Sequence, residues 1–386
     1  MDKILIVGGG PAGVAAAETL RAEGHAGPVT LLCGEPELPY DRPPLSKQVL
    51  TGAWPTDRTR LREASHYADR DIRLVPGQAS ALDLSSRTVV LNDGYELGYD
   101  GLIIATGVHP RRLASGHELA GVHVLRGCQD AAALRSAFAS NDGVVIVGAG
   151  FLGMEVAAAA ATLGLRVTVL DPLAQPMIRQ IGPRIGAEVA RLHRAHGVDV
   201  RTDTLVTGLT GAGGRVTGVL LADGSVIPAD CVLVAIGSVP ATGWLHGSGL
   251  PLGDGIECDE YCRAAPGVYA AGDVACWPHP RYRRRMRVEH RMHAAEQGTA
   301  AARNLLHGDT EPFAPLPYFW TDQYRVKIQV HGDPDITDCT ATIEEGSVEE
   351  GKFVALYHKD GIVTAVLGWN AAGRVPGYRK LLLNQQ

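Results

Sequence analysis

Two groups of glycines in this 386-residue chain have the spacing of a dinucleotide-binding turn, G-x-G-x-x-G. The groups are Gly8, Gly10 and Gly13, and Gly148, Gly150 and Gly153. In such a turn the first glycine permits a tight bend, the second lets the backbone approach a pyrophosphate, and the third lets a helix pack on a strand. The helix that follows faces the phosphates with its unpaired N–H groups. One such turn is weak evidence, but two favour two bound dinucleotides.

Each glycine group lies between a predicted strand and a predicted helix. Ile4–Val7 form a short apolar run that suits a parallel strand buried on both faces, and an Ala-rich helical sequence follows the turn. A second strand is predicted in each unit, ending at Glu35 in the first and at Asp171 in the second. A carboxylate at this point can accept hydrogen bonds from ribose hydroxyl groups.

Three more predicted strands end in glycine-containing turns, within residues 100–107, 230–237 and 267–275. Asp273, in the last of these turns, could hold a ribityl hydroxyl or receive a helix cap. Either role suits the far end of a long flavin coenzyme.

Composition describes an ordinary globular protein of two or three domains, with 45% hydrophobic and 20% charged residues. The net charge of −6 argues against general nucleic-acid binding. Seven cysteines, an odd number without a C-x-x-C pair, predict neither a zinc ribbon nor a disulfide framework, and no metal site is expected. No signal peptide precedes the first strand and no apolar run is long enough to span a bilayer, so a cytoplasmic protein is expected.

Taken together, these motifs resemble those of the two-dinucleotide-binding flavoprotein reductases in the pyridine nucleotide-disulfide oxidoreductase superfamily. Two further segments, LPYDRPPLSK (residues 38–47) and PYFWTDQYRVKIQ (residues 317–329), narrow the resemblance. They are similar to segments of the oxygenase-coupled NADH-dependent ferredoxin reductases, a family with putidaredoxin and rubredoxin reductases among its members. The resemblance covers essentially the whole chain.

The fold that this resemblance implies is α/β, with two Rossmann-like domains arranged as in glutathione reductase and a C-terminal α+β domain. The first unit is expected to bind FAD and the inserted second unit NADH. The implied domains are 1–110 and 239–311 for FAD, 111–238 for NAD(H), and 312–386 for the C-terminal domain.

The resemblance also implies which residues contact the two coenzymes. The residues expected to bind FAD or NADH are Gly8, Gly10, Pro11, Ala12, Gly13, Glu35, Arg42, Lys47, Ala79, Ala105, Thr106, Gly107, Gly148, Gly150, Phe151, Leu152, Gly153, Asp171, Gly237, Gly272, Asp273 and Trp320. Arg42 is expected to contact the flavin or pyrophosphate, or else to form a structural salt bridge. Trp320 is expected to cover the isoalloxazine ring or to pack within the third domain.

Lys47 closes the proline-rich segment and is the first of two expected catalytic residues. In the related reductases this lysine pairs with a glutamate near the start of the second unit's helix, and the matching residue is Glu155. The pair is expected beside flavin N5, where a cation would orient the ring and stabilise negative charge on the reduced flavin. The simpler readings are that Glu155 interacts with the helix dipole and that Lys47 is a solvated charge.

Two further features of the sequence concern the choice of nicotinamide coenzyme and the route of the electrons. Asp171 can bind the 2′-hydroxyl of the adenosine ribose and would repel a 2′-phosphate, which favours NADH over NADPH. No cysteine occurs between Pro39 and Lys47, and Cys33 is expected to be a buried, inert thiol, so no thiol relay is predicted.

An arginine-rich segment, residues 281–291, follows the Asp273 turn in this otherwise acidic chain. Its arginines are Arg281, Arg283, Arg284, Arg285, Arg287 and Arg291. An acidic [2Fe–2S] ferredoxin that serves a terminal oxygenase is the expected partner, because complementary charge speeds the encounter of transient partners. A solvated charged loop is the alternative.

Arg291 and His293 stand where related reductases usually have Trp and Asn, so the partner or the electron route is expected to differ from the common pattern. The helix after Glu289 is expected to direct its N-terminus at the flavin pyrimidine. Two other functions stay open: an NADH oxidase or diaphorase that reduces oxygen or quinones, and a flavoprotein whose redox state controls partner binding. The oligomeric state is expected to be monomeric or homodimeric.

Overall fold

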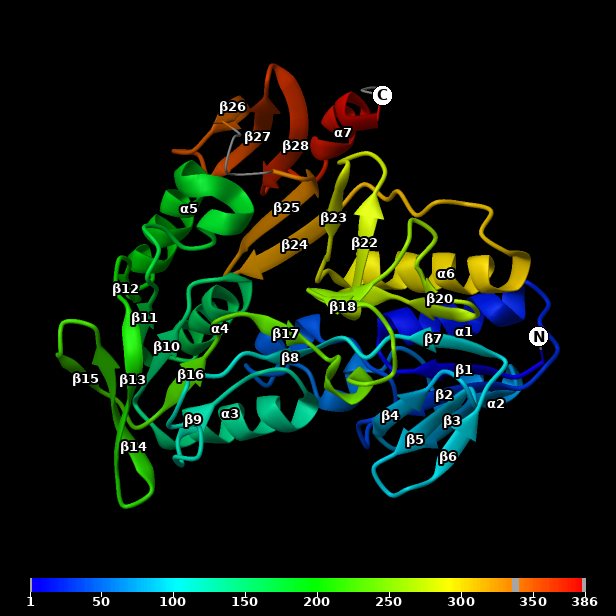
Figure 1. Cartoon of the computed structure of the whole chain (residues 1–386). Helices are drawn as coiled ribbons and strands as arrows, with labels where there is room; N and C mark the ends of the chain where they lie inside the picture. The colour runs from blue at the N-terminus through cyan, green and yellow to red at the C-terminus, as the bar shows by residue number, and fades with distance from the viewer. Residues whose placement is uncertain (1, 335–339, 384–386) are drawn as a thin grey trace. The chain divides into compact units, whose positions relative to one another are not determined.

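The computed structural model describes residues 2–334 and 340–383, which form two compact units (Figure 1). The first unit comprises Met1–Asp41, Asp57–His109 and Val239–Pro317, and the second comprises Arg42–Thr56, Pro110–Ser238 and Tyr318–Gln386. Cys339 lies outside the described residues, and the cysteines within them are free thiols.

The first unit is built on a six-stranded sheet with the strand order β20-β21-β7-β1-β2-β3. Five of its strands run parallel, and β20 pairs antiparallel with β21 at the edge. The strands are β1 (Ile4–Val7), β2 (Val29–Cys33), β3 (Ile72–Pro76), β7 (Gly101–Ile104), β20 (Arg263–Ala265) and β21 (Val268–Ala270). Every residue of β1 and β7 is buried, which explains why both read as uninterrupted apolar or glycine runs.

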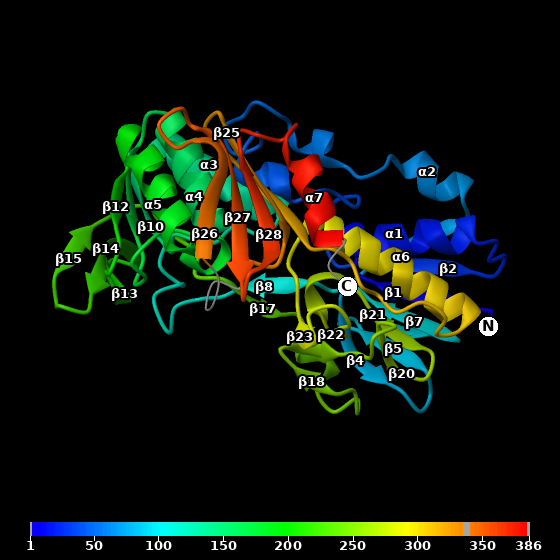
Figure 2. The same cartoon turned by 90° about the horizontal axis from the view of Figure 1, so that it is seen from above.

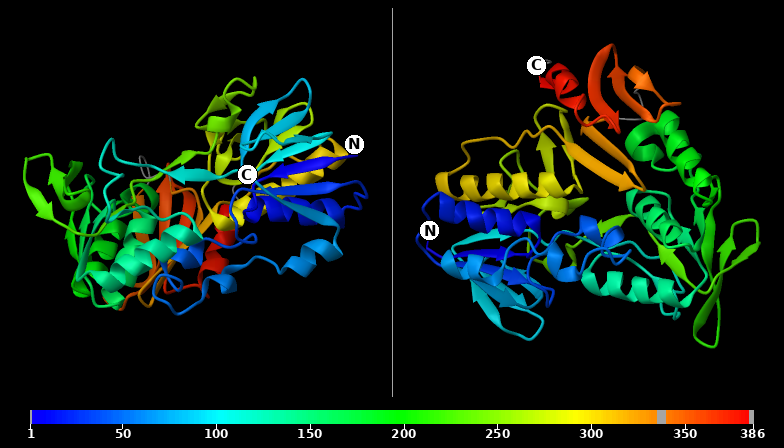
Figure 3. Two further views of the ribbon diagram at one scale, coloured as in Figure 1. Left: turned by 90° about the horizontal axis from the view of Figure 1, so that it is seen from below. Right: turned by 180° about the vertical axis from the view of Figure 1, so that it is seen from behind.

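Helices α1 (Pro11–Ala22) and α6 (Arg291–His307) lie side by side against this sheet (Figures 1 and 3). Their close approach depends on Gly298 of α6, where an added Cβ would lie 2.1 Å from the carbonyl oxygen of Ala12. Since that contact is to backbone, a larger residue at this position would force the helices apart. The pairing brings the N-terminal part of the unit together with residues almost 300 positions later.

Smaller elements complete the first unit. An antiparallel sheet joins β4 (Ala79–Asp83), β5 (Thr88–Leu91) and β6 (Glu96–Gly98). A mixed sheet joins β18 (Leu252–Gly253), β19 (Gly255–Glu257), β22 (Ala275–His279) and β23 (Arg284–Met286), and in it β19 and β22 run parallel. Short helices are α2 (Ala64–Asp69), η2 (Thr56–Thr59), η3 (Gly243–Leu245) and η4 (Gly272–Val274). Leu82, Val89 and Leu91 of β4 and β5 belong to the same hydrophobic core as β1.

The second unit contains a parallel sheet with the order β12-β11-β10-β16-β9. Its strands are β9 (Val122–His123), β10 (Gly143–Val147), β11 (Arg166–Leu170), β12 (Asp199–Arg201) and β16 (Val232–Val234). Its helices are α3 (Cys128–Ser140), α4 (Phe151–Thr162), α5 (Ile178–Ala195) and η1 (Pro43–Ser46). A three-stranded antiparallel sheet of β13 (Val206–Ala212), β14 (Arg215–Leu221) and β15 (Val226–Pro228) extends from it.

An antiparallel sheet with the order β24-β25-β28-β27-β26 also belongs to the second unit (Figure 2). The elements are β24 (Tyr318–Gln323), β25 (Val326–Gly332), β26 (Thr340–Ser347), β27 (Lys352–Lys359), β28 (Ile362–Trp369) and α7 (Val375–Leu383). Within the unit, β24 contacts α4, β26 contacts α5, and α7 packs on β28. Finally, β8 (Val108–Pro110) pairs with β17 (Ser238–Pro240), and these strands lie at the two ends of the second unit's segment Pro110–Ser238.

The predicted fold class is confirmed, since each unit contains a parallel sheet with the strand–turn–helix order expected around its glycine group. At the C-terminal end of the described residues, β27 and β28 form an antiparallel hairpin, and α7 follows it. The first unit's second strand ends earlier than predicted, at Cys33 instead of Glu35. The four predicted domain ranges stay a prediction beside the two units described above.

Candidate functional site: two dinucleotide cradles and a buried ion pair

The first glycine turn follows β1, and its three glycines differ in what surrounds them. Gly8 has a φ of +121°, and a Cβ there would lie 2.2 Å from the carbonyl oxygen of Ala105. At Gly13 a Cβ would lie 1.9 Å from the carbonyl oxygen of Gly8, so α1 packs directly on the turn. A Cβ on Gly10, the N-cap of α1, would meet no atom within 4 Å. The middle glycine therefore borders open space at a helix N-terminus, as a pyrophosphate cradle requires.

The second turn, after β10, has the same geometry. Gly148 has a φ of +108°, and its added Cβ would lie 2.3 Å from the carbonyl oxygen of Ala235. At Gly153 the added Cβ would lie 1.9 Å from the carbonyl oxygen of Gly148, whereas Gly150 borders open space. The chain thus carries two cradles of the same design, one in each unit, and both fit a dinucleotide.

Other predicted coenzyme residues of the first unit surround its cradle. Ala105 follows β7 and donates its N–H to the carbonyl oxygen of Val7 at 2.8 Å. The Thr106 hydroxyl donates to the carbonyl oxygen of Ala241 at 3.1 Å. Gly272 has a φ of +78° and donates its N–H at 2.9 Å to the side-chain oxygen of the buried Gln297. The cradle is therefore framed by β7 and by η4, the short helix that carries Asp273.

Both predicted ribose carboxylates have partners within the protein. Glu35 accepts a short hydrogen bond from the hydroxyl of Tyr40. Asp171 directly follows β11 and accepts two backbone N–H groups, from Ala149 at 2.7 Å and from Leu173 at 2.8 Å. Each carboxylate oxygen can accept a further hydrogen bond, so these contacts fix the orientation of Asp171 beside its glycine turn and leave room for a ribose.

Lys47 and Glu155 form an ion pair inside the second unit. Lys47 Nζ lies 2.6 Å from Glu155 Oε2, and the two side chains are only 13% and 10% exposed. Ser46 donates its hydroxyl to the same carboxylate oxygen at 2.6 Å. The pair links the end of η1 to α4, one turn after the second glycine group. In this protected setting the attraction between the charges is much stronger than at a solvated surface.

Two residues that the sequence did not single out contact this pair. The first is Ser46, described above, and the second is Thr321, which is fully buried on β24 and donates its hydroxyl to Glu155 Oε1 at 2.8 Å. Next to Thr321, Gln323 is also fully buried. Thr321 and Gln323 alternate with partly exposed residues along β24, and polar residues on the buried face of a strand were the available signal.

The remaining predicted coenzyme residues occupy different settings. Arg42 donates to the carbonyl oxygen of Arg126 at 2.8 Å. Trp320 is partly exposed, with its ring 5.9 Å from that of Tyr318, while Phe319 packs edge-on against Phe151 at 5.1 Å. Further predicted residues are the partly buried Pro11 and Leu152, the buried Ala12, Ala79 at the start of β4, and Gly107 and Gly237 at positive φ. Their roles toward a coenzyme stay predictions.

The arginine-rich segment forms the hairpin of β22 and β23 and the chain that follows it. Arg281 and Arg283 lie in the connection, and Arg283 and Arg284 are exposed. Their guanidinium groups therefore form the cationic part of the hairpin tip.

The other three arginines of this segment bind groups within the first unit. Arg285 donates to the carbonyl oxygens of Cys258 and Cys276. Arg287, only 12% exposed, pairs with Asp254 and Glu289. Arg291 pairs with Asp41 at 2.8 Å. Of these three, Arg285 is exposed and Arg287 is the most covered.

His293 and His290 lie at the start of α6. His293 is buried, and its ring stacks at 4.9 Å on the indole of the fully buried Trp277. Burial, together with the neighbouring His290, lowers the pKa of His293 to about 3, and burial lowers the pKa of His290 to about 4. Both rings are therefore neutral at physiological pH and add no positive charge at this helix end. Burial also raises the pKa of the Cys33 thiol to about 11, so this cysteine is not a thiolate nucleophile.

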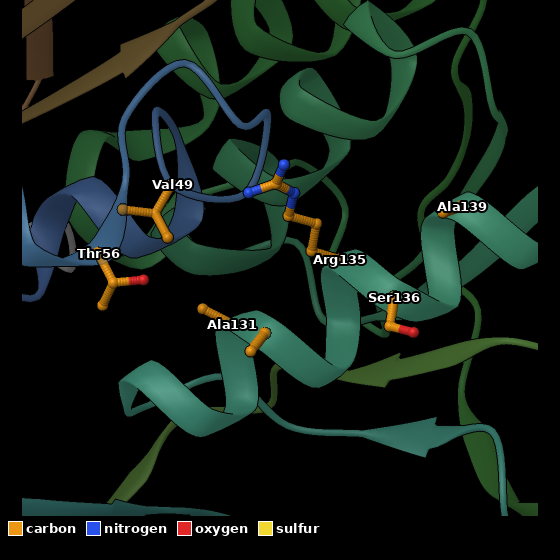
Figure 4. Close-up of a pocket in the computed structure, with 7 residues that line it drawn as sticks. Val49, Thr56, Ala131, Arg135, Ser136 and Ala139 are labelled. Carbon is orange, nitrogen blue, oxygen red and sulfur yellow. The ribbon is translucent and has the colours of Figure 1, made fainter.

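Figure 4 shows a groove between α3 and the segment after Lys47, with a volume of about 320 Å³. Its lining includes Val49, Thr56, Arg135 and Ser136, and none of the predicted site residues that the structure describes. The guanidinium of Arg135 points at the loop, where Gly52 at φ +78° gives it room.

Two negative findings apply to residues 2–334 and 340–383. Within these ranges no helix combines the length and the apolar character that a membrane crossing needs. The same ranges contain no cluster of three or more His, Cys, Asp or Glu side chains placed to hold a metal ion.

Two strand–turn–helix cradles in one chain define an oxidoreductase fold that binds two dinucleotides. The chain belongs to the pyridine nucleotide-disulphide oxidoreductase family, which residues 2–298 match, and residues 318–386 match the reductase C-terminal family. The predicted family is therefore confirmed, and FAD and NADH are the coenzymes that this membership implies.

Individual relatives narrow the comparison. The chain is 38% identical to rhodocoxin reductase of Rhodococcus erythropolis over 91% of this chain and 82% of the relative. It is 36% identical to the benzene 1,2-dioxygenase system ferredoxin–NAD(+) reductase subunit of Pseudomonas putida, over 96% and 90% of the two chains. The crystal structure of the ferredoxin reductase for the CYP199A2 system from Rhodopseudomonas palustris superposes with a TM-score of 0.96 at 33% identity, covering 100% and 96% of the two chains.

Within the second cradle, the different surroundings of Gly153 and Gly150 predict different effects for an alanine at each position. Gly153→Ala places a methyl group against the backbone of Gly148 and should lower the melting temperature of the protein, at a cost of about 1–3 kcal/mol or more. Gly150→Ala has open space and should keep the melting temperature, yet weaken NADH binding because its methyl group stands where a pyrophosphate would approach. Thermal unfolding and NADH titration separate the two. Normal NADH affinity in Gly150→Ala would contradict the assignment of this cradle.

Proposed function

We propose that this protein is an FAD-containing, NADH-dependent ferredoxin reductase. It passes electrons to a [2Fe–2S] ferredoxin that serves a terminal oxygenase, either a Rieske-type dioxygenase or a cytochrome P450. The observation that carries the proposal is the presence of two dinucleotide cradles in a chain whose relatives include named ferredoxin reductases. The geometry of the cradles supports two coenzymes, and the relatives support the acceptor.

In this proposal the first unit holds FAD and the second holds NADH. Gly8–Gly13, Ala105–Gly107 and Gly272–Asp273 hold FAD, and Gly148–Gly153 with Asp171 hold NADH. When bound, the flavin would accept two electrons from NADH as a hydride and pass them on one at a time. The negative charge of Asp171, fixed by two backbone N–H groups, favours a ribose hydroxyl over a 2′-phosphate and therefore NADH over NADPH.

Lys47 and Glu155 are the proposed catalytic pair. Three donors converge on Glu155: the Lys47 ammonium, the Ser46 hydroxyl and the Thr321 hydroxyl. These contacts fix the Lys47 cation in position before any coenzyme arrives, so no reorganisation is needed during reaction. We assign to Lys47 the stabilisation of negative charge on the reduced coenzyme.

The cationic hairpin tip is the proposed docking surface for the ferredoxin. Arg281, Arg283 and Arg284 supply its charge, and the contacts of Arg285 and Arg287 within the first unit support the hairpin. Complementary charge accelerates encounter without holding the partner tightly, which suits a carrier that must leave after each electron.

The function is tested by mixing the purified holoenzyme anaerobically with NADH or with NADPH. We expect NADH to bleach the flavin absorbance much faster than NADPH does. Adding a [2Fe–2S] ferredoxin should then make cytochrome c reduction depend on the ferredoxin. Rapid bleaching without ferredoxin dependence would instead indicate an oxidase, a diaphorase or a redox-controlled binding protein.

Lys47→Met tests the catalytic pair. Removing a charge that stabilises the reaction should slow flavin reduction by NADH at least about tenfold, or weaken FAD retention. Stopped-flow absorbance measures the rate, and released flavin measures retention. Lys352→Met, which neutralises an exposed lysine of the same unit, is the matched control. If Lys47→Met reduces at the wild-type rate and keeps its FAD, the assigned role is wrong.

Charge reversal at Arg283 and Arg284 tests the docking surface. The double Glu variant leaves Arg285 in place because Arg285 supports the backbone of the unit. It should raise the KM for ferredoxin about tenfold at low salt, since exposed charges act mainly on encounter, and leave ferricyanide reduction unchanged. The control reverses two exposed arginines of the other unit, Arg215 and Arg325, and so alters the net charge equally. Equal losses with both acceptors, or in both variants, would argue against docking at this hairpin.

A further inference from the structure

A continuous series of hydrogen bonds leads from Glu155 through the interior of the second unit. Thr321 contacts Glu155 Oε1 at 2.8 Å, and the amide nitrogen of Gln323 lies 3.3 Å from the Thr321 hydroxyl. The other end of the Gln323 amide contacts His193 Nε2 at 2.9 Å. His193 Nδ1 then lies 3.3 Å from the hydroxyl of Tyr324. The series joins α4, β24 and α5, and its last member lies in the turn between β24 and β25.

The carboxylate at one end imposes a single direction on this series. Glu155 carries no hydrogen to donate when it is paired with Lys47, so Thr321 must donate its hydroxyl hydrogen to Glu155. The Thr321 oxygen is then free to accept from the Gln323 amide nitrogen, which also lies 3.4 Å from Met177 Sδ.

The same logic continues to the far end. The Gln323 oxygen can only accept, so His193 must carry its hydrogen on Nε2 and leave Nδ1 bare. The bare Nδ1 accepts the Tyr324 hydroxyl. Every donor in the series therefore points toward Glu155.

Burial makes this order obligatory. Thr321, Gln323 and His193 are each fully buried, so water cannot replace a missing donor or acceptor. Burial also lowers the pKa of His193 to about 4, which leaves its ring neutral at physiological pH. A neutral ring has one donor and one acceptor nitrogen, and the two tautomers correspond to the two possible directions of the series.

We propose that Thr321, Gln323 and His193 are positioning residues that act on Lys47 through Glu155. The series holds the carboxylate in one rotamer with Oε2 toward Lys47. The tautomer of His193 depends on whether residue 155 accepts a hydrogen bond from Thr321 or donates one to it. That the positioned cation acts on a bound flavin rests on the proposed function, whereas the link between Glu155 and the His193 tautomer does not.

Glu155→Gln should reverse the series. The oxygen of the new amide belongs where Oε2 now lies, because the Lys47 ammonium and the Ser46 hydroxyl are both donors there. Its NH₂ group then faces Thr321 as a donor, so the Thr321 hydroxyl must donate toward Gln323 instead. The Gln323 amide turns over, and His193 receives a donor at Nε2 and carries its hydrogen on Nδ1.

Nitrogen NMR of the holoenzyme labelled with ¹⁵N-histidine tests this reversal, with the His193 signals assigned by their loss in His193→Gln. We expect the Nε2–H tautomer in the wild type and the Nδ1–H tautomer in Glu155→Gln. The variant Lys47→Met/Glu155→Gln removes both charges together, avoids an unpaired buried charge, and should show the same change. Glu188→Gln, an equal change of charge on α5, should keep the wild-type tautomer. An unchanged His193 tautomer in both Glu155 variants would overturn the proposal.

Kinetics separate positioning from fold maintenance. Thr321→Val removes one donor to a charged group and should slow flavin reduction by NADH about tenfold, while Thr321→Ser keeps the hydroxyl and should stay within about twofold of the wild type. NADH affinity should not change in either variant. A wild-type rate in Thr321→Val would overturn the positioning role. If instead Lys47→Met reduces at the wild-type rate while Glu155→Gln still changes the tautomer, the proposed role of Lys47 toward the flavin fails and the linked series remains.

Discussion

The close contact between a glycine and a backbone carbonyl is the constraint on which both halves of this protein depend. In each unit the third glycine of the turn lies so near the first that a Cβ would stand 1.9 Å from a carbonyl oxygen. This contact lets the helix begin directly over the end of the strand, so its N-terminal N–H groups and the open middle glycine share one small space. A larger residue would displace the helix from the strand, and with it the anion-binding end.

A second constraint, the burial of charge, organises the second unit. Removing Lys47 or Glu155 alone would leave an unpaired charge in a poorly solvated place, which typically costs about 3–5 kcal/mol. The protein surrounds the carboxylate with hydroxyl donors from η1 and β24, and β24 belongs to the C-terminal sheet. The C-terminal sheet is therefore more than a covering layer, because it supplies one of the groups that orient the carboxylate.

The sequence predicted the strands, helices and cradles well, for a physical reason. Apolar runs such as Ile4–Val7, followed by glycines at fixed spacing, depend on contacts between neighbouring residues, so local pattern contains the necessary information. Contacts between distant residues are different. Thr321 and Glu155 are 166 positions apart, and nothing in the local pattern around Thr321 indicates which partner its hydroxyl meets. For the same reason the arginine run could be recognised as cationic, while the engagement of Arg287 and Arg291 with nearby carboxylates could not.

The order in which the chain visits its two units has a consequence for folding. Three segments of each unit alternate along the sequence, beginning with Met1–Asp41 and ending with Tyr318–Gln386. Neither unit is a contiguous stretch, so neither can finish its core before distant parts of the chain have been synthesised. Helix α1, for example, lacks the helix it packs against until α6 emerges. Such contacts between distant segments slow folding. Apolar strands made early therefore stay exposed until the later segments that cover them have been synthesised.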